Sequence, residues 1–123
     1  MQDVVARGDE LEAVEQPWGR LRWLVDGERC PGAGMTLGVV EIAPGESNQR
    51  HMHDCEEVLY LIAGELEHAI GDEWVRLRAG DAIRIPKGTP HQARNVGGST
   101  ARMVVAYDSP RRGFTPVAGG PLP

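Results

Sequence analysis

Glycine and proline divide this chain into short segments, and the frequency of these turn-forming residues limits the possible folds more than any other feature. The 123 residues include 16 glycines and 9 prolines, a share that favours turns over long helices. Between the turns, hydrophobic side chains alternate with polar ones. In residues 19–25, for example, Leu21, Trp23 and Val25 share one face of a strand. We predict eight strands, at residues 19–25, 35–42, 58–63, 66–70, 74–77, 82–85, 92–95 and 102–107. Eight short strands with a turn about every ten residues indicate an all-β sandwich or barrel.

The predicted strands fill residues 17–107, which we expect to form a single barrel domain. Before them, residues 1–16 predict a short irregular or helical lead-in. After them, residues 108–123 are rich in proline, glycine and arginine and predict an extended C-terminal tail. Such a tail either crosses to a neighbouring subunit or frays at the end of the chain.

Charge and hydrophobic pattern argue against several classes of partner. With 13 basic and 18 acidic residues, the net charge of −5 disfavours nucleic acid or an anionic membrane surface as a main partner. No hydrophobic run approaches the ~18 residues of a membrane-spanning helix, and the first residues lack a signal-peptide pattern. The two cysteines, Cys30 and Cys55, do not form the disulfide framework of a small secreted protein. We therefore expect a cytoplasmic protein with no nucleic-acid or membrane partner.

Three of the four histidines fall in two short segments that suit metal binding. On a strand, His51 and His53 point to the same side, and Glu57 begins the next hydrophobic strand shortly afterwards. His91 follows a stiff turn, residues 86–90, that contains two prolines and leads into another strand. Three imidazoles and a carboxylate that converge inside a barrel suit a divalent transition metal. In octahedral geometry, they leave two positions for water, dioxygen or substrate.

Ten residues of these segments fall into two spaced patterns. The first pattern, G-x5-H-x-H-x3-E-x6-G, spans residues 45–64 and is matched by Gly45, His51, His53, Glu57 and Gly64. The second pattern, G-x5-P-x-G-x2-H-x3-N, spans residues 80–95 and is matched by Gly80, Pro86, Gly88, His91 and Asn95. Both are the core motifs of the cupins, so the chain resembles a small single-domain cupin. The resemblance implies a cupin jelly-roll β-barrel.

The same resemblance implies a cofactor and an assembly. In cupins, the residues at the positions of His51, His53, Glu57 and His91 bind one divalent transition metal ion per chain, which is iron, manganese, nickel, zinc or copper. A homodimer is also expected, since a half-open barrel of this size leaves sheet edges and hydrophobic outer residues to cover. Small cupins include dioxygenases, decarboxylases, lyases, isomerases and polyketide-cyclase-like proteins.

Three further polar residues each have two candidate roles. Gln49 lies two residues before His51. It either faces the metal, where it would bind substrate or orient a ligand, or lies before the strand begins. Asn95 is expected to hydrogen-bond in a turn or behind the ligands, or to contact substrate, rather than to bind the metal. His68 alternates with hydrophobic neighbours, which favours a packed core position. It becomes the candidate catalytic base if that face lines the pocket.

Other reactive, hydrophobic and basic residues are expected to be structural. Cys55 is expected to pack as a small hydrophobic residue, although a thiolate there could reach the metal or a substrate. Core packing is favoured over pocket lining for Trp23, Met35, Tyr60 and Met103. Solvated positions are favoured over binding of an anionic substrate for Arg84, Arg102, Arg111 and Arg112.

Together these features predict a metal-dependent enzyme, dioxygenase-like or polyketide-cyclase-like, whose small organic substrate chelates the metal through adjacent oxygens. A non-catalytic cupin that binds a sugar or a carboxylate is the alternative. A barrel that is merely stabilised by its metal is the third interpretation. It is the least favoured of the three because structural metal sites normally keep no open position.

Overall fold

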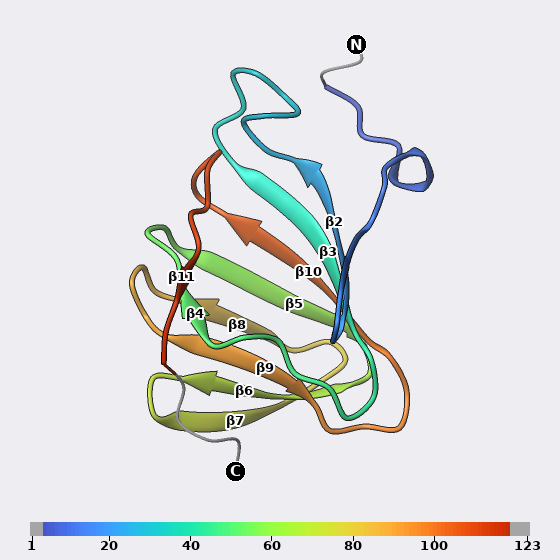
Figure 1. Cartoon of the computed structure of the whole chain (residues 1–123), viewed down its shortest axis with the longest axis vertical. Coiled ribbons are helices and arrows are strands. Elements are labelled where there is room, and N and C mark those ends of the chain that lie inside the picture. The colour runs from blue at the N-terminus through green and yellow to red at the C-terminus, as the bar shows by residue number, and fades with distance from the viewer. Residues whose placement is uncertain (1–3, 119–123) are drawn as a thin grey trace.

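The computed structural model describes residues 4–118, and most of its regular structure consists of short strands joined by turns (Figure 1). The strands are β1 (Val14–Gln16), β2 (Gly19–Val25), β3 (Thr36–Ile42), β4 (His51–Met52), β5 (Glu57–Ala63), β6 (Glu65–Ile70), β7 (Glu73–Arg78), β8 (Ala82–Ile85), β9 (His91–Asn95), β10 (Ala101–Tyr107) and β11 (Thr115–Pro116). All eight predicted strands are present, and their ends differ from the predicted ends by at most one residue.

The strands form two antiparallel sheets whose inner faces enclose a core and a cavity. The six-stranded sheet has the order β1-β2-β3-β10-β5-β8, and the five-stranded sheet has the order β11-β4-β9-β6-β7. Neighbours such as β3 and β10 are far apart in the chain, because the chain crosses between the sheets as in a jelly roll. The predicted all-β jelly-roll fold is therefore confirmed.

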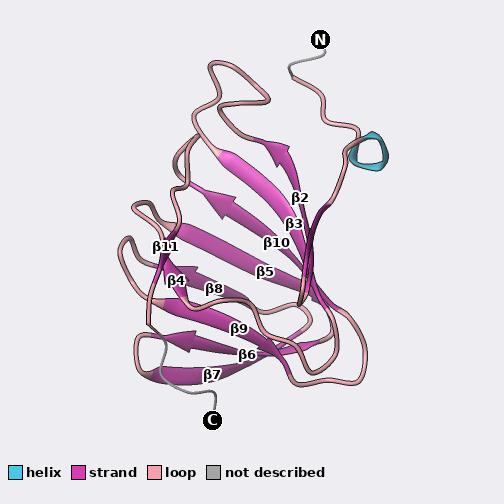
Figure 2. Cartoon of the chain, viewed as in Figure 1, coloured by secondary structure: helices cyan, strands magenta, loops and turns pink. Residues whose placement is uncertain are grey.

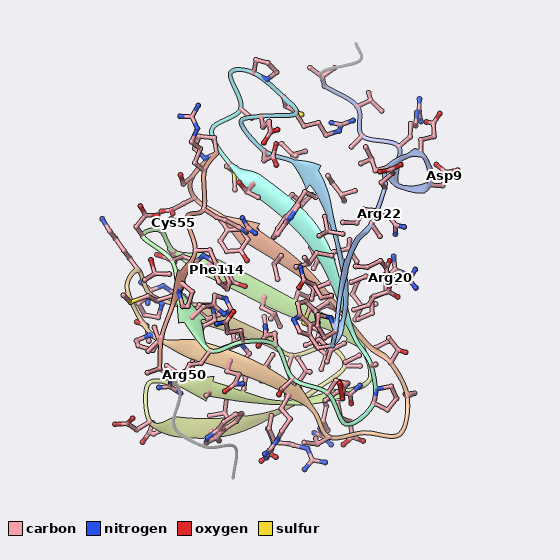
Figure 3. The ribbon with its side chains drawn as sticks, viewed as in Figure 1. Asp9, Arg20, Arg22, Arg50, Cys55 and Phe114 are labelled. Atoms are coloured by element: carbon pink, nitrogen blue, oxygen red, sulfur yellow. The ribbon has the colours of Figure 1, made fainter. Side chains whose placement is uncertain are left out.

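Alternation along the strands decides which side chains face inward. On β2, Leu21 and Trp23 pack against the core, while Arg20 and Arg22 lie on the other face (Figure 3). The register with β3 shifts between Trp23 and Val25, so the regular alternation predicted for residues 19–25 is interrupted at the end of the strand. The prediction is thus correct for the part of β2 that borders the cavity.

Hydrophobic residues from both sheets form the core between them. Its buried members include Val40, Ile42, Leu59, Leu61, Leu66, Met103 and Val105. Trp23 fits against this core because Gly38, opposite it on β3, has no side chain. A Cβ atom at Gly38 would lie 2.5 Å from Cε3 of the Trp23 ring. The glycine therefore sets the position of one aromatic wall of the cavity.

Two residues that were expected in the core lie on the surface instead. Met35 precedes β3 and is 56% exposed, and Tyr60 is 47% exposed. Because alternation on β5 buries Leu59, it leaves Val58, Tyr60 and Ile62 on the outer face of the sheet. The prediction of core packing is wrong for Met35 and Tyr60.

The segment before the barrel is more extended than a helical lead-in. Gly8–Glu10 forms a 3₁₀ helix (Figure 2), and Val14–Gln16 then form β1. β1 pairs with β2 through the register Val14 to Leu21, and this pairing satisfies backbone groups that local sequence preference leaves open. Within residues 4–118, no helix is both long enough and apolar enough to cross a membrane.

The described part of the C-terminal tail folds back onto its own chain. In β11, Thr115 pairs with Met52 and Pro116 pairs with His51, so the tail adds an edge strand beside β4. The Val117 amide donates to the Arg50 carbonyl at 3.1 Å and extends the contact. Residues 119–123 of the predicted tail lie outside the described residues.

Candidate metal centre

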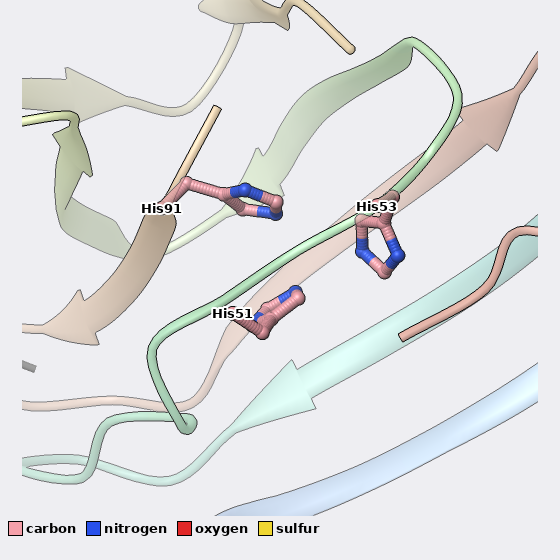
Figure 4. Close-up of side chains that lie close together, drawn as sticks. All are labelled: His51, His53 and His91. Atoms are coloured by element: carbon pink, nitrogen blue, oxygen red, sulfur yellow. The ribbon is translucent and has the colours of Figure 1, made fainter. Parts of the chain in front are cut away.

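Three histidines from two separate segments converge inside the barrel (Figure 4). His51 begins β4 and His91 begins β9, and these two residues pair directly across the five-stranded sheet. His53 follows β4 and lies beside them, with its ring centroid 4.7 Å from that of His51. One nitrogen from each ring lies within 4.8 Å of the others, and all three side chains are buried. The structure therefore brings together three residues that could bind one metal ion.

Backbone carbonyls hold each of these rings in one orientation. The Nδ1 atoms of His51, His53 and His91 face the carbonyls of Gln49, Gly113 and Thr89 at 2.6, 2.6 and 2.9 Å. A carbonyl only accepts, so each Nδ1 carries the proton and each Nε2 keeps its lone pair. Nε2 of His53 and of His91 is buried without a hydrogen-bond partner. Neutral imidazoles fixed in this way by an outer hydrogen bond are the usual form of metal-binding histidine.

Glu57 adds a carboxylate to the same point. It begins β5, as predicted, and is 4% exposed. Its Oε1 atom lies 3.1 Å from Nε2 of His91 and 3.6 Å from Nε2 of His53. In this tautomer these contacts bring lone pairs together, and Oε1 has no hydrogen-bond donor. Buried acceptors facing one another without a donor fit a cation between them, so the donor set suits a divalent transition metal.

The protonation states of these groups also suit a metal. Burial, followed by the neighbouring His91, lowers the pKa of His51 from 6.5 to about 3, and burial also lowers the pKa of His53. Burial alone would raise the pKa of Glu57, but the facing His91 and His53 outweigh it and lower that pKa. Near neutral pH the imidazoles of His51 and His53 are therefore neutral and the Glu57 carboxylate is ionised, which are the forms that bind metal.

The buried histidines predict that metal-free protein loses stability in mild acid. The pKa of His68 is lowered from 6.5 to about 4, mainly by burial, and that of His51 to about 3. Below pH 6.5 the unfolded chain binds more protons than the folded one, so stability falls as pH falls. Each such histidine contributes up to about 1.4 kcal/mol per pH unit in this window.

Urea unfolding of chelator-treated protein at pH 7 and pH 5 measures this loss of stability, and His68→Gln should make the loss smaller. Equal free energies of unfolding at the two pH values would contradict the expectation.

A cavity of about 310 Å³ opens beside the three histidines. Residues of both sheets and of the C-terminal segment line it: Gln16, Trp18, Leu21, Trp23, Val40, Asn48, Gln49, His51, His53, Glu57, Leu59, His68, His91, Ala93, Met103, Val105, Tyr107, Arg112 and Phe114. Its size is that of a pocket for a small organic molecule, and its wall divides almost evenly between hydrophobic side chains and polar or charged ones.

Comparison with known proteins identifies the family of this chain. The protein-family model described as "Cupin domain" matches residues 38–107, more than half of the chain. This chain belongs to the cupin family. The matched range contains all three histidines and Glu57, so the predicted family is confirmed.

The relatives of this cupin differ in what their names describe. It is 34% identical over 96 residues to "Polyketide synthase CurC" of Streptomyces cyaneus, across 77% of this chain and 62% of that protein. It is 41% identical over 69 residues to "Tetracenomycin polyketide synthase protein TcmJ" of Streptomyces glaucescens, across 55% of this chain and 46% of that protein. This cupin thus spans less than two thirds of the length of either relative. A solved oxalate oxidase in complex with the substrate analogue glycolate has a TM-score of 0.81 and 27% identity, over 95% of this chain and 65% of that one.

The structure places the other predicted polar residues of this cupin in different surroundings. Gln49 precedes β4, as in the second of its two predicted roles, yet it still lines the cavity. Asn95 is 1% exposed and is not among the residues that line the cavity. Its side chain donates to the carbonyls of Ile42 and Ser99 and accepts from the amide of Gly97. These contacts are those of a residue that holds a turn.

His68 satisfies both of its predicted descriptions. It is 1% exposed, as expected for a core residue, and it also lines the cavity. Its ring stacks on that of His91, with centroids 5.8 Å apart, and its Nδ1 faces the Ala69 carbonyl at 3.1 Å. Burial is the main cause of its lowered pKa, so this histidine is neutral near pH 7.

Cys55 is buried, and its thiol donates to the carbonyl of Arg112 at 3.4 Å. Burial raises its pKa, so the sulfur stays a thiol near neutral pH.

Of the four arginines that were expected at solvated positions, Arg84, Arg102 and Arg111 are exposed. Arg112 differs, because it is half-buried and lines the cavity. The expectation of a solvated position is wrong for this residue.

Sequence reasoning missed the contribution of the C-terminal segment to the site. The Gly113 carbonyl accepts from His53 across 60 residues of chain. The ring of Phe114 (Figure 3) stacks on His51, with centroids 4.6 Å apart and planes inclined by 19°. No motif covers residues 112–114, and their composition resembles that of any polar tail. The cupin motifs thus identify the donors but not the segment that covers and orients two of them.

Substituting Gly113 should weaken metal binding without removing a donor. Its φ is +61°, and a Cβ atom would lie 2.7 Å from Oδ1 of Asp54, so Gly113→Ala should move the carbonyl that orients His53. Loss of such an orienting hydrogen bond typically costs about 10- to 100-fold in metal affinity. Competition with a chromophoric chelator measures the dissociation constant. Gly98→Ala is the control, because a Cβ there meets open space. Unchanged affinity in Gly113→Ala would rule out the orienting role.

Proposed function

We propose that this cupin is a metal-dependent enzyme that acts on a small organic substrate, and that His51, His53, His91 and Glu57 are the four metal ligands. One observation carries the proposal: buried, unpaired acceptor atoms of His53, His91 and Glu57 meet, with His51 in the same cluster, beside an open cavity of about 310 Å³. A site with protein ligands on one side and a cavity on the other has the layout of a catalytic centre. A purely structural metal would instead be enclosed by protein ligands.

The metal would supply the reactive chemistry, and the chain would supply position and environment. A bound divalent transition ion supplies Lewis acidity and, if it is iron, oxygen activation. The protein residues hold the substrate, with the hydrophobic wall excluding water and Gln49 or Asn48 within the cavity as amide partners. Neutral His68 is the candidate to accept a proton from bound substrate, because its Nδ1–H is committed to Ala69 and its Nε2 keeps a lone pair.

The comparisons support two reaction types within this proposal. Relatives are named as polyketide synthase proteins, and a similar solved structure is an oxalate oxidase that binds glycolate. A cyclase-like reaction on a polyketide-type substrate would use the ion as a Lewis acid. A dioxygenase-like reaction would consume oxygen. In both cases the substrate would be one that offers adjacent oxygens to the ion.

Metal analysis followed by a substrate screen tests the proposal. The protein is reconstituted with iron, manganese, nickel, zinc or copper, and conversion of catechol-like, keto-acid and polyketide-like compounds is followed by mass spectrometry and oxygen uptake. We expect turnover in the metal-loaded wild type and none in chelator-treated protein or in His53→Ala. Turnover that survives loss of the metal would overturn the proposal. Saturable ligand binding without turnover would replace the enzyme with a binding protein for a sugar or carboxylate.

A further inference from the structure

Arg112 occupies an unusual position for an arginine in a C-terminal tail. Its guanidinium carbon lies 4.0 Å from the centroid of the Trp23 ring, which places the charged group over the ring face. Both residues line the cavity that also holds the three histidines. The guanidinium is therefore held at the wall of the cavity rather than extended into solvent.

Among the residues that the structure describes, no carboxylate forms an ion pair with this charge. Within residues 4–118, Arg112 forms no ion pair, whereas Arg84 and Arg76 on the outer faces are paired with Glu56 and Glu65. Among the residues that line the cavity, Glu57 is the one carboxylate, and it faces the histidines. An arginine that faces a cavity with no acidic partner is suited to bind an anionic group from a ligand.

Aromatic rings connect the arginine to the histidine cluster. The His53 and Tyr107 centroids lie 5.0 Å apart, the Tyr107 and Trp23 centroids lie 6.1 Å apart, and Arg112 covers Trp23. An aromatic wall therefore connects the clustered histidines with the guanidinium. Phe114 is a further aromatic residue at the cavity wall. A flat hydrophobic body along this wall would place its two ends at the histidines and at Arg112.

The size of the cavity limits that body. A cavity of about 150 Å³ holds one benzene molecule, so about 310 Å³ suits roughly two fused rings. A two-carbon diacid would leave the hydrophobic wall uncovered. A large polycyclic molecule would extend past Arg112 into solvent.

We propose that Arg112 recognises an anionic group, such as a carboxylate, on a ligand with a flat hydrophobic body of about two rings that lies along Trp23 and Tyr107. This proposal names the substrate class of the proposed enzyme and rests on the proposed function for the end that reaches the metal. Binding of the anionic group by Arg112 does not depend on the metal, so it can be tested in metal-free protein.

Two matched probes that lack a chelating group isolate the Arg112 end. Naphthalene-2-sulfonate carries the charge, and naphthalene-2-sulfonamide has the same rings without it. Calorimetric titration of the full chelator-treated chain, in which neither probe can bind a metal ion, should show about a tenfold preference for the sulfonate, as expected for one charge-assisted hydrogen-bonded pair. Arg112→Gln should remove that preference and leave sulfonamide binding within about twofold. Arg112→Lys should retain part of the preference because it keeps the charge.

Arg111→Gln is the control, since Arg111 is exposed, is adjacent in the chain and lies outside the cavity. It should keep the full preference. Equal affinity of the wild type for the two probes would overturn the proposal, and this comparison needs no variant. If Arg111→Gln lost the sulfonate preference as fully as Arg112→Gln, the proposal would also be overturned. The preference would then come from attraction of the anion to any nearby positive charge. Failure of the proposed function would give a different result from failure of the Arg112 proposal. In that case the protein would bind no metal, but chelator-treated protein would still bind the sulfonate more tightly than the sulfonamide.

Discussion

Replacing His91 with alanine should reduce the metal bound per chain from the expected one ion to less than about a tenth of an ion, since a site that loses one of four donors rarely holds a transition metal through gel filtration. The loss follows from the geometry, because His91 pairs with His51 across the sheet and its Nε2 lies 3.1 Å from Glu57. Elemental analysis after reconstitution and gel filtration measures it, with the wild type and His53→Ala treated in parallel. A full ion retained in His91→Ala would contradict the ligand assignment.

His68→Asn is the matched control for this experiment. His68 is buried and stacks on His91, but its Nδ1 is bonded to Ala69 and it is not one of the three clustered histidines. We expect this variant to keep about one ion per chain. A thermal melt of each variant shows whether it is folded, so that loss of metal is not confused with loss of structure.

Asn95→Ala destabilises the protein by about 3–5 kcal/mol, because each buried partner left without its hydrogen bond costs about 1–3 kcal/mol. Asn95 joins the end of β3 to the turn after β9 by donating to Ile42 at 2.9 Å and Ser99 at 2.8 Å and accepting from Gly97 at 2.9 Å. The alanine variant leaves two carbonyls and one amide without these partners in a position that is 1% exposed. Urea unfolding of the metal-free protein measures the change.

Gln92→Ala provides the comparison for that measurement. Gln92 lies on the same strand and is also buried, but its amide donates one hydrogen bond, to the carbonyl of Asn48 at 2.7 Å. Its loss should cost about 1–2 kcal/mol. If Asn95→Ala cost no more than Gln92→Ala, the network around Asn95 would not be the structural element inferred from its contacts.

Much of the barrel follows from local sequence. Alternation and turns predict the eight longer strands because a strand with one buried face needs a hydrophobic residue at every second position. The two strands that were missed, β1 and β11, are three and two residues long, and the strand expected to carry both His51 and His53 ends at Met52. A pattern that repeats every second residue is not visible over so short a length. These strands form because longer neighbours offer them backbone partners, as β2 does for β1.

The cupin motifs likewise place the donors but not their surroundings. The spacing of His51, His53, Glu57 and His91 is readable because His51, Glu57 and His91 each begin a strand and His53 directly follows one. The role of Arg112 is not readable in this way. It depends on a contact with Trp23, which lies on a different strand far away in the chain.

By itself the sequence determined the strand pattern, the family and the histidines and carboxylate that form the candidate centre, since alternation, turn chemistry and motif spacing are all local properties of the chain. The tertiary structure alone decided that the C-terminal segment returns to the barrel, where Gly113 orients His53, Phe114 stacks on His51 and Arg112 faces the cavity. The first of these contacts joins residues 60 positions apart in the chain, and the segment meets His53 and His51 because the fold brings β11 beside β4. No short stretch of sequence contains that information.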